Sequence, residues 1–439
     1  MVGAGLLVLP AHRVRPDVVL CDAWPPLAEG TFYGVLYLGG VGLLCACWVR
    51  VLREPDTPPL GRVILSGLPV HLVALLGPPF LSQDPLFYAA LGRALAAGGT
   101  PDTPLQAVLP GQDPFLAVLP PHWRGGTSSY GPGFHWLARG VAQLAHDRLW
   151  LQLRLYQATG LLASLGTAVL TGWAAGARAA AGVLFCPLLV VEGTQSGHND
   201  VWLALVTAAF SLLLVRGRRL AAGLALLAGL LVKASALLLL AFYGLSALPW
   251  PRRPAVRRAL PWLLAAGGVG VGVLLRPWHP LDVLVGVPGG PFEYCTRSIE
   301  CLPRVLLRYG LQAPGAAWGV GLAFRAAGLV WLCHCALAAQ AEGAPLRWAA
   351  ALLFVYYLYL HAWSQSWYLL PLLPLLPHAC PRLRPAMLTL LGTATAYYAL
   401  AIPFACVQRE WAIALVDLAQ GLVVVVPPTA VLYRRLRHG

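Results

Sequence analysis

The sequence predicts an all-α integral membrane protein that crosses the bilayer many times. Of its 439 residues, 58% are hydrophobic and only 11% are charged, whereas a soluble domain carries about 25% charged residues. Apolar runs of about 20 residues recur along the chain and are separated by short turns that carry arginine. Because backbone polar groups in hydrocarbon need internal partners, helices are the expected spanning form. We expect one integral membrane domain, residues 1–439, with about 11 to 13 transmembrane helices.

The arginines indicate the orientation of these helices. The formal net charge is +14 at pH 7, but the basic residues fall mostly at the ends of apolar runs. This is the pattern of cytoplasmic loops in membrane proteins and not that of a nucleic-acid-binding patch. The clusters that we place in the cytoplasm are Arg50, Arg53 and Arg62; Arg178; Arg216, Arg218 and Arg219; Arg252, Arg253, Arg257 and Arg258; Arg382 and Arg384; and Arg434, Arg435 and Arg437. The expected partners therefore include membrane lipids and no nucleic acid.

The spans follow from the apolar runs. Residues 1–31 begin with an apolar piece that is too short to span and lacks a cleavage pattern, so we expect no cleaved signal peptide. The expected spans are 32–49, 63–81, 149–173, 179–191, 201–215, 220–248, 259–275, 316–338, 348–361, 368–377, 385–404 and 413–433. Arginine clusters flank 220–248 on both sides, so this run should leave and return as two short helices or a broken hairpin. Lys233, the only lysine of the chain, would lie near its far tip.

Two stretches without a clear span are expected on the extracytoplasmic side, residues 82–147 and 276–315. In the first, Asp84 is a suitable N-cap for a helix over 86–97, whose apolar face would lie along the membrane surface. The second contains two cysteines that would be able to form a disulfide in an oxidising compartment: Cys295 and Cys301.

Two ionisable residues stand out because each lies at the edge of the membrane or within it. Asp84 directly follows a span, so it is either a plain helix cap or a general base at the boundary between water and membrane. Lys233 interrupts an apolar run, and a charge at that depth needs a partner or a cavity. Its ammonium group either reaches to the interface or binds an anion such as phosphate.

A nine-residue stretch carries more polar groups than a helix cap needs. It runs from Glu192 to Asp200 and contains five of them: Glu192, Gln195, His198, Asn199 and Asp200. These residues are either the lining of a site or only the cap of the next helix. A metal site built from His198 and the two carboxylates is a third reading, but one histidine with carboxylates at this spacing is a weak ligand pattern. We expect no resident metal or cofactor.

The polar residues are predicted to gather on one side of the membrane. Asp84, Tyr130, the stretch 192–200 and Lys233 all fall at outer ends of spans, whereas the cytoplasmic turns are short and basic. An aromatic turn ends on the same side with Trp367 and Tyr368, which form either an interfacial belt or a stacking surface for a sugar ring or a prenyl chain. This segregation favours an outward-facing enzyme.

Several of these pieces together resemble a known family. They are Asp84-Pro-Leu-Phe-Tyr88-Ala-Ala-Leu-Gly92-Arg93, Ser129-Tyr130-Gly131-Pro132, Gly197-His198-Asn199-Asp200, Lys233 in a broken span, and Gln365-Ser366-Trp367-Tyr368. In this order they resemble the polyprenol-phosphate-dependent membrane glycosyltransferases of the GT-C fold. The greatest likeness is to the bacterial mannosyltransferases that use polyprenol-phosphate mannose.

The resemblance implies an inverting transfer of a sugar, mannose in the most similar enzymes, from a polyprenyl-phosphate donor to a glycan or lipid acceptor. It also implies a multi-pass protein of the cell membrane with an extracytoplasmic active site. Asp84 would be the catalytic base, and the donor phosphate would be bound by Lys233, Arg297 and Arg304. The residues expected to bind the sugar or the acceptor are Tyr88, Tyr130, Glu192, His198, Asn199, Asp200, Trp367 and Tyr368.

Two other functions stay open at this point. A transporter or flippase of lipid-linked sugars would carry ionisable residues in the middle of spans on both of two repeats, whereas we find only Lys233 at depth and no internal repeat. An outward-facing polysaccharide polymerase or ligase would rely on arginine and histidine of the outer loops and not on Asp84.

Overall fold

The computed structural model describes residues 27–79, 82–119, 121–248, 262, 299–307, 311–361, 365–402 and 410–437. Its regular elements are α2 (Leu27–Arg53), α3 (Leu60–Leu76), α4 (Asp84–Ala96), α5 (Leu105–Val108), α6 (Pro114–Ala117), α7 (Pro121–Arg124), α8 (Pro132–Ala145), α9 (Leu149–Ala175), α10 (Ala177–Leu184), η2 (Leu189–Gln195), α11 (Asp200–Val215), α12 (Arg219–Gly229), α13 (Ala236–Ala247), α17 (Cys301–Val305), α18 (Pro314–Glu342), α19 (Pro345–Val355), η5 (Tyr356–Leu360), η6 (Ser366–His378), α20 (Arg384–Ala396), α21 (Tyr398–Ala401) and α22 (Glu410–Arg437). Across these ranges the regular structure is helical, and the one β-bridge joins Tyr130 to Lys233. The predicted all-α class is confirmed.

The length and apolar character of the helices show that this is a membrane protein. Three described helices are long and apolar enough to cross a bilayer: Phe32–Arg53, Leu149–Ala175 and Gly315–Glu342. The pair α10 and η2 makes a fourth candidate span, which is bent by 69°. Further apolar helices among the described residues are shorter. The predicted number of 11 to 13 spans therefore stays a prediction, and the expected span 259–275 lies outside the described residues.

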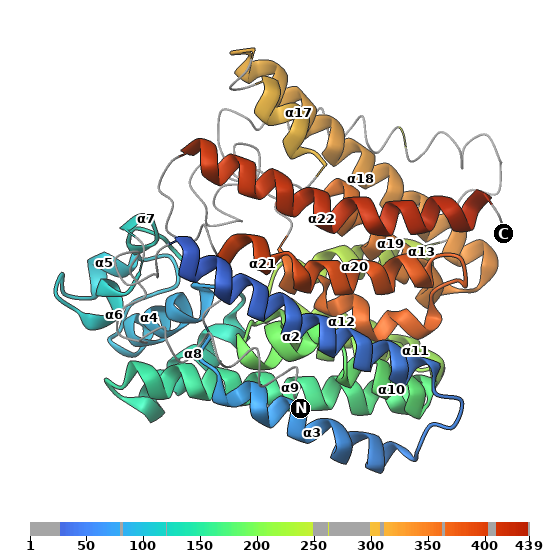
Figure 1. The fold of residues 1–439 in the computed structure, drawn as a ribbon, viewed down its shortest axis with the longest axis horizontal. Helices are drawn as coiled ribbons and strands as arrows, with labels where there is room; N and C mark the ends of the chain where they lie inside the picture. The colour runs from blue at the N-terminus through green and yellow to red at the C-terminus, as the bar shows by residue number, and fades with distance from the viewer. Residues whose placement is uncertain are drawn as a thin grey trace.

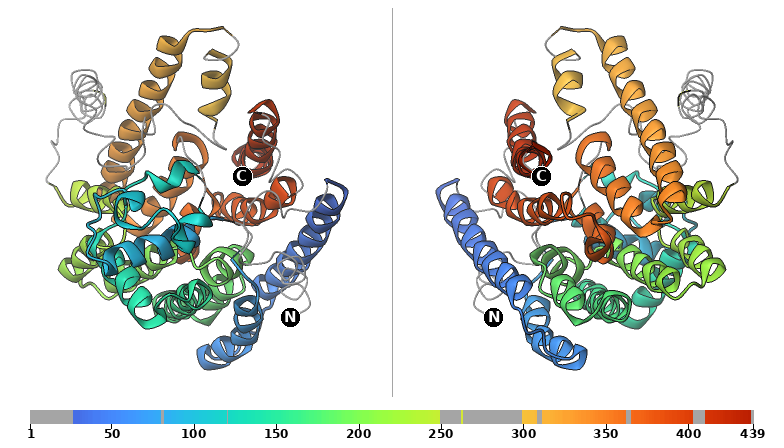
Figure 2. Two further views of the ribbon diagram at one scale, coloured as in Figure 1. Left: turned by 90° about the vertical axis from the view of Figure 1, so that its left-hand side faces the viewer. Right: turned by 90° about the vertical axis from the view of Figure 1, so that its right-hand side faces the viewer.

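Short helices cover one end of the helix bundle. Figure 1 shows α4 to α8 gathered at its left end, and in the left view of Figure 2 they face the viewer. They share a separate core that includes Phe87, Phe115 and Phe134, and Tyr156 of α9 connects this core to the bundle. Gly92 allows α4 to approach α8 closely, because a Cβ there would lie 2.4 Å from the carbonyl oxygen of Ala138.

Two expectations for the first outer loop need correction. The N-cap of α4 is Gln83, and Asp84 is the first helical residue, with no capping hydrogen bond from the side chain of the N-cap. Nearly every residue of α4 is buried, because α5, α6, α8 and α9 pack around it, so α4 is not a surface helix. The amphipathic helix of this region is α8, which buries Phe134 and Val141 and leaves Trp136 73% exposed.

The predicted broken hairpin is confirmed. Helix α12 ends at Gly229, a turn over 230–235 contains Lys233, and α13 begins at Ala236 and packs back against α12. The backbone N–H of Gly131 donates to the carbonyl oxygen of Val232 at 2.8 Å. The loop that carries Tyr130 and Gly131 is thereby docked on the tip of the hairpin.

The expected span 368–377 forms a different kind of helix. Residues Ser366–His378 adopt a 3₁₀-helix, η6, with prolines at 371, 374 and 377. A spacing of three places these prolines on one face of a helix with three residues per turn, whereas proline inside an α-helix removes a hydrogen bond and clashes. The 13 residues of η6 extend about 26 Å at about 2 Å per residue. An α-helix of that length would extend about 20 Å.

Candidate active site

The segment that carries Glu192 is shaped by glycines. Helix η2 is a π-helix that passes very close to α9, because a Cβ on Gly160 would lie only 2.1 Å from the carbonyl oxygen of Gly193. Gly197 has φ +68°, a conformation that residues with a side chain rarely adopt. The chain therefore turns sharply between Glu192 and His198, which brings both side chains to the same place.

His71 of α3 holds η2 against its neighbours. Its Nε2 lies 2.9 Å from the carbonyl oxygen of Leu184, and its Nδ1 lies 2.7 Å from Oγ1 of Thr194. A carbonyl oxygen only accepts, so Nε2 carries the proton, and Nδ1 accepts a hydrogen bond from the Thr194 hydroxyl. The sequence analysis did not identify this residue, because a lone histidine in an apolar run carries no local signal of its partners.

Asp84, His198 and Glu192 form a row. Nδ1 of His198 lies 3.5 Å from Oδ2 of Asp84, and its Nε2 lies 3.4 Å from Oε2 of Glu192. The side chains of His198 and Glu192 are fully buried, whereas that of Asp84 is 17% exposed. The first turn of α4 therefore presents a carboxylate to solvent, and a histidine and a second carboxylate lie behind it.

Aromatic side chains enclose the histidine. The ring of Trp367 stacks on His198, with centroids 4.0 Å apart and planes at 13°. The hydroxyl of Tyr88 donates to Oδ1 of Asn199 at 3.2 Å and lies 3.5 Å from Nδ1 of His198. Elements that are far apart in the sequence, α4, η2 and η6, thus meet at this ring.

Lys233 binds the same polar segment through Asp200. Its Nζ donates to Oδ2 of Asp200 at 2.8 Å. The ammonium also lies 4.3 Å from the ring centroid of Tyr368 and 5.9 Å from that of Tyr130. The faces of both rings attract a cation. Lys233 therefore has a carboxylate partner and two aromatic neighbours.

The phenols of the outer loop are neutral donors. Burial raises the pKa of Tyr88 well above its usual value, and the neighbouring Tyr130 and Asp84 add to the rise. Burial also raises the pKa of Tyr130, and the charge of Asp84 adds to it. Both hydroxyls therefore keep their protons at neutral pH.

Several polar atoms of the same segment lack partners among the described residues. The amide group of Gln195, the hydroxyl of Ser196 and Nδ2 of Asn199 are buried without a hydrogen bond there. Each such atom costs about 1–3 kcal/mol, and a native protein retains few of them. Their concentration beside Asp84 and Lys233 is typical of a site and not of a packed core.

The arginines expected at the donor phosphate are placed differently. Arg297 lies outside the described residues, as does Cys295 of the predicted disulfide. Arg304 of α17 is buried and pairs with Glu300 at 2.7 Å, which also pairs with Arg325 of α18 at 2.6 Å. Figures 1 and 2 show α17, which carries Arg304, at the upper edge of the protein and away from α4. Phosphate binding by the two expected arginines, 297 and 304, stays a prediction.

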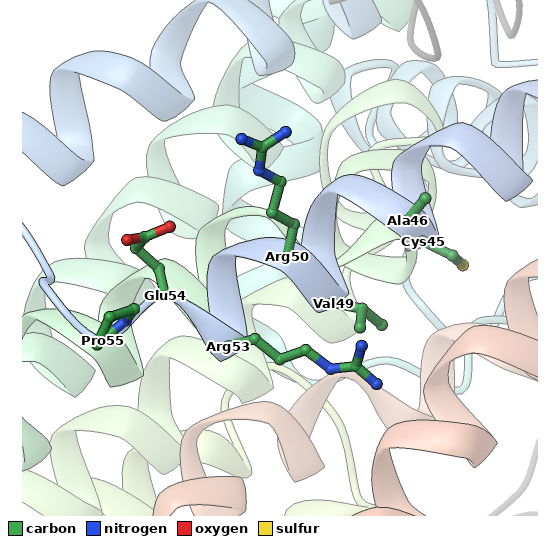
Figure 3. A pocket seen from close by; sticks show the side chains of 7 residues that line it. All are labelled: Cys45, Ala46, Val49, Arg50, Arg53, Glu54 and Pro55. Carbon is green, nitrogen blue, oxygen red and sulfur yellow. The ribbon is translucent and has the colours of Figure 1, made fainter.

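Three hollows among the described residues differ in their position, size and lining residues. One, of about 570 Å³, lies beside the last turns of α2, and Figure 3 shows its Arg50, Arg53 and Glu54 pointing in different directions. Another, of about 500 Å³, lies between α4 and α8 at Arg93. The third, of only about 20 Å³, is an apolar slot that includes Leu203 and Ala236, each three residues beyond a member of the Asp200–Lys233 pair. Only the third adjoins the candidate site.

The described residues contain no group of three or more histidines, cysteines and carboxylates that is placed to hold a metal ion. The expectation that the protein needs no metal stays a prediction. The structure thus brings together the expected site residues that it describes, with the exception of Arg304.

Comparisons with known proteins point to one family. Residues 2–249 match the family model described as alpha-(1->6)-mannopyranosyltransferase, N-terminal domain. Alpha-(1->6)-mannopyranosyltransferase A of Corynebacterium glutamicum is 27% identical over 278 residues, which are 56% of this chain and 55% of the relative. The protein of the same name from Mycobacterium tuberculosis is 24% identical over 298 residues, 66% of this chain and 57% of the relative. The chain thus spans about half the length of the curated relatives it matches. No solved structure matches it.

Proposed function

The chain belongs to the alpha-(1->6)-mannopyranosyltransferase family, and we propose that it transfers a mannosyl group from a polyprenyl-phosphate donor to an extracytoplasmic glycan or lipid acceptor, with inversion. The family match confirms the resemblance to mannosyltransferases that the sequence motifs indicated. The matched residues include Asp84, the stretch 192–200 and Lys233.

One observation carries this proposal. The segment 198–200 contacts a carboxylate through His198, which faces Asp84, and an ammonium group through Asp200, which binds Lys233. A glycosyl transfer needs a base for the acceptor hydroxyl and a cation for the departing phosphate. A carboxylate and an ammonium group held by one polar segment support these two roles.

Asp84 is the base in this mechanism. Its carboxylate is the exposed member of the row that it forms with His198 and Glu192. It takes the proton of the acceptor hydroxyl while the acceptor oxygen attacks C1 of the mannosyl group. The bond between C1 and the phosphate oxygen breaks, and polyprenyl phosphate leaves with the bonding electron pair and one more negative charge.

Lys233 stabilises that additional charge. An ammonium group has three N–H donors, and one of them is directed to Asp200. Two remain for the oxygens of a phosphate. Tyr368 and Tyr130 keep the side chain in this position through cation–π contacts. Tyr88, Tyr130, Asn199 and Trp367 lie next to His198 or Lys233 and would orient the sugar or the acceptor.

The apolar slot supports a lipid-borne donor. Its walls include Leu203 of α11, Leu226 of α12 and Leu239 of α13, so it lies within the helices that carry the Asp200–Lys233 pair. A phosphate bound at Lys233 and a prenyl chain lying against these apolar helices form one amphiphilic ligand, which a nucleotide sugar does not match. The family match favours this transferase over a transporter, and the position of Asp84 beside His198 favours it over a polymerase that relies on outer-loop arginine.

The proposal can be tested in washed membranes that contain the protein. Radiolabelled polyprenyl-phosphate mannose should label an α-(1→6)-linked oligomannoside or a lipid acceptor, and labelled GDP-mannose should not. Asp84→Asn should abolish the transfer at unchanged protein abundance, whereas the exposed Asp147→Asn serves as the matched control. Undiminished transfer by Asp84→Asn, or direct use of GDP-mannose, would contradict the proposal.

A further inference from the structure

We infer that His198 and Glu192 form a buried proton relay behind Asp84 and serve as positioning residues for the base. This inference rests on the function proposed above and gives these two residues a role other than contact with the sugar. Three observations support it: both side chains are buried, the imidazole ring of His198 is held in one orientation, and the proton that Asp84 takes from the acceptor needs a second acceptor.

Burial separates the roles within the row. His198 and Glu192 have no exposed surface, and Asp84 lies between them and solvent. A substrate can therefore contact Asp84 while the other two act through it. Both ring nitrogens of His198 face a carboxylate, at 3.5 Å for Asp84 and 3.4 Å for Glu192. An imidazole placed between two carboxylates is in position to pass a proton from one side to the other.

The ring is held in this orientation from several sides. Trp367 stacks on one face of the ring, and the Tyr88 hydroxyl lies 3.5 Å from Nδ1. The backbone that carries Glu192 is fixed by the hydrogen bond between Thr194 and His71. The 3.4 and 3.5 Å separations exceed those of strong N–H···O hydrogen bonds, and such contacts between catalytic groups commonly shorten in the reactive complex.

Other titratable groups also face this row. Tyr88 and Asp200 are close to Asp84 and His198, and Lys233 neutralises Asp200. On the far side, Tyr37 of α2 and Tyr398 of α21 face Glu192. These neighbours are phenols, apart from the Asp200–Lys233 pair.

The relay balances in charge and protons. Asp84 removes the proton of the acceptor hydroxyl and becomes a neutral carboxylic acid. His198, with its proton on Nε2 toward Glu192, accepts the new proton at Nδ1 and becomes an imidazolium. Asp84 is a carboxylate again while the products are still bound, and the carboxylate of Glu192 stabilises the imidazolium. After the products leave, the proton returns through Asp84 to water.

The test compares His198→Gln and Glu192→Gln with the wild type in the labelled-donor assay. Each should lower kcat about 100-fold, a typical contribution of a general acid–base group, with KM values for donor and acceptor unchanged within about threefold. The acidic limb of the pH–rate profile should move in both variants, because the proton that Asp84 removes then lacks either its second acceptor or the carboxylate that stabilises it there. Glu192→Asp should recover part of kcat.

His378→Gln is the matched control. His378 is another histidine with a hydroxyl partner, Ser211 at 2.9 Å, on η6 and outside the row, so its substitution should not move the acidic limb. A wild-type limb and kcat in both His198→Gln and Glu192→Gln would refute the relay and leave the proposed transfer intact. Absence of transfer by the wild type would instead refute the proposed function. If His198→Gln does not fold, the isosteric Glu192→Gln tests the relay by itself. A purely structural role for Glu192 would lower protein abundance without moving the acidic limb of the pH–rate profile.

Discussion

The docking of the outer loop on the hairpin tip predicts an unusual sensitivity to a single methyl group. In Gly131→Ala the new Cβ would lie 2.3 Å from the carbonyl oxygen of Leu230 and 2.5 Å from that of Leu231. No real Cβ tolerates backbone atoms at this distance, so the loop must move away from the tip. Gly140→Ala is the matched control, because a Cβ there meets nothing within 4 Å.

The size of the effect follows from the hydrogen bonds that hold the loop. Gly131 N–H donates to Val232 at 2.8 Å, and Phe134 N–H donates to Leu231 at 3.1 Å. Each contributes about 0.5–1.5 kcal/mol, so the loss of both makes local opening easier by about 1–3 kcal/mol. That corresponds to amide exchange about 5- to 150-fold faster, whereas Gly140→Ala should stabilise α8 by about 0.5–1 kcal/mol.

Hydrogen exchange of the purified protein, followed by mass spectrometry of the segment 128–136, measures this opening. The transfer activity of Gly131→Ala should fall with it, because Tyr130 is displaced from the Lys233 ammonium group. Wild-type exchange and activity in Gly131→Ala would show that the loop and the hairpin tip are not coupled, and would remove the structural basis for placing Tyr130 at the site.

Two further predictions concern charge. Lys233→Met leaves the buried carboxylate of Asp200 without its cation and should destabilise the protein by about 3–5 kcal/mol. The double variant Lys233→Met, Asp200→Asn should recover much of the wild-type unfolding temperature, but it should not recover the use of the donor. The pKa values of Tyr88 and Tyr130 are raised, so the folded state keeps two protons that the unfolded state releases above about pH 10. The contribution of these two groups to stability is therefore complete below that pH and is lost above it. The drop in unfolding temperature between pH 8 and pH 11 should be smaller in Tyr130→Phe than in the wild type.

Charge placement made part of this structure predictable. Arginines at both ends of the run 220–248 required the chain to return to the side from which it started, and a single lysine marked the tip. The same argument predicts Asp84, the stretch 192–200 and Lys233 on one side of the membrane. The structure brings these residues together, as that prediction requires.

Local geometry was less predictable, because it depends on partners that are distant in sequence. Asp84 has the sequence signature of a cap, but its carboxylate faces His198 instead of its own backbone. The helix over 366–378 takes the 3₁₀ form since its prolines recur every three residues, a spacing that hydropathy does not report. Arg304 was expected at the phosphate because it lies in an outer loop, yet Glu300, one turn before it, holds its guanidinium group.

The segment 198–200 explains why base and cation belong to one site. His198 and Asp200 are two residues apart, and the left-handed conformation of Gly197 fixes the turn from which both side chains start. One faces Asp84 and the other holds Lys233, so a shift of this turn would displace both charges together. An inverting displacement needs the base and the leaving group on opposite faces of the sugar carbon. Gly197→Ala should therefore lower transfer more than either Tyr88→Phe or Tyr130→Phe, since it disturbs both partners of the displacement at once. The measurement is kcat at equal protein abundance. If the two charges act independently, the order of the kcat values would be the opposite.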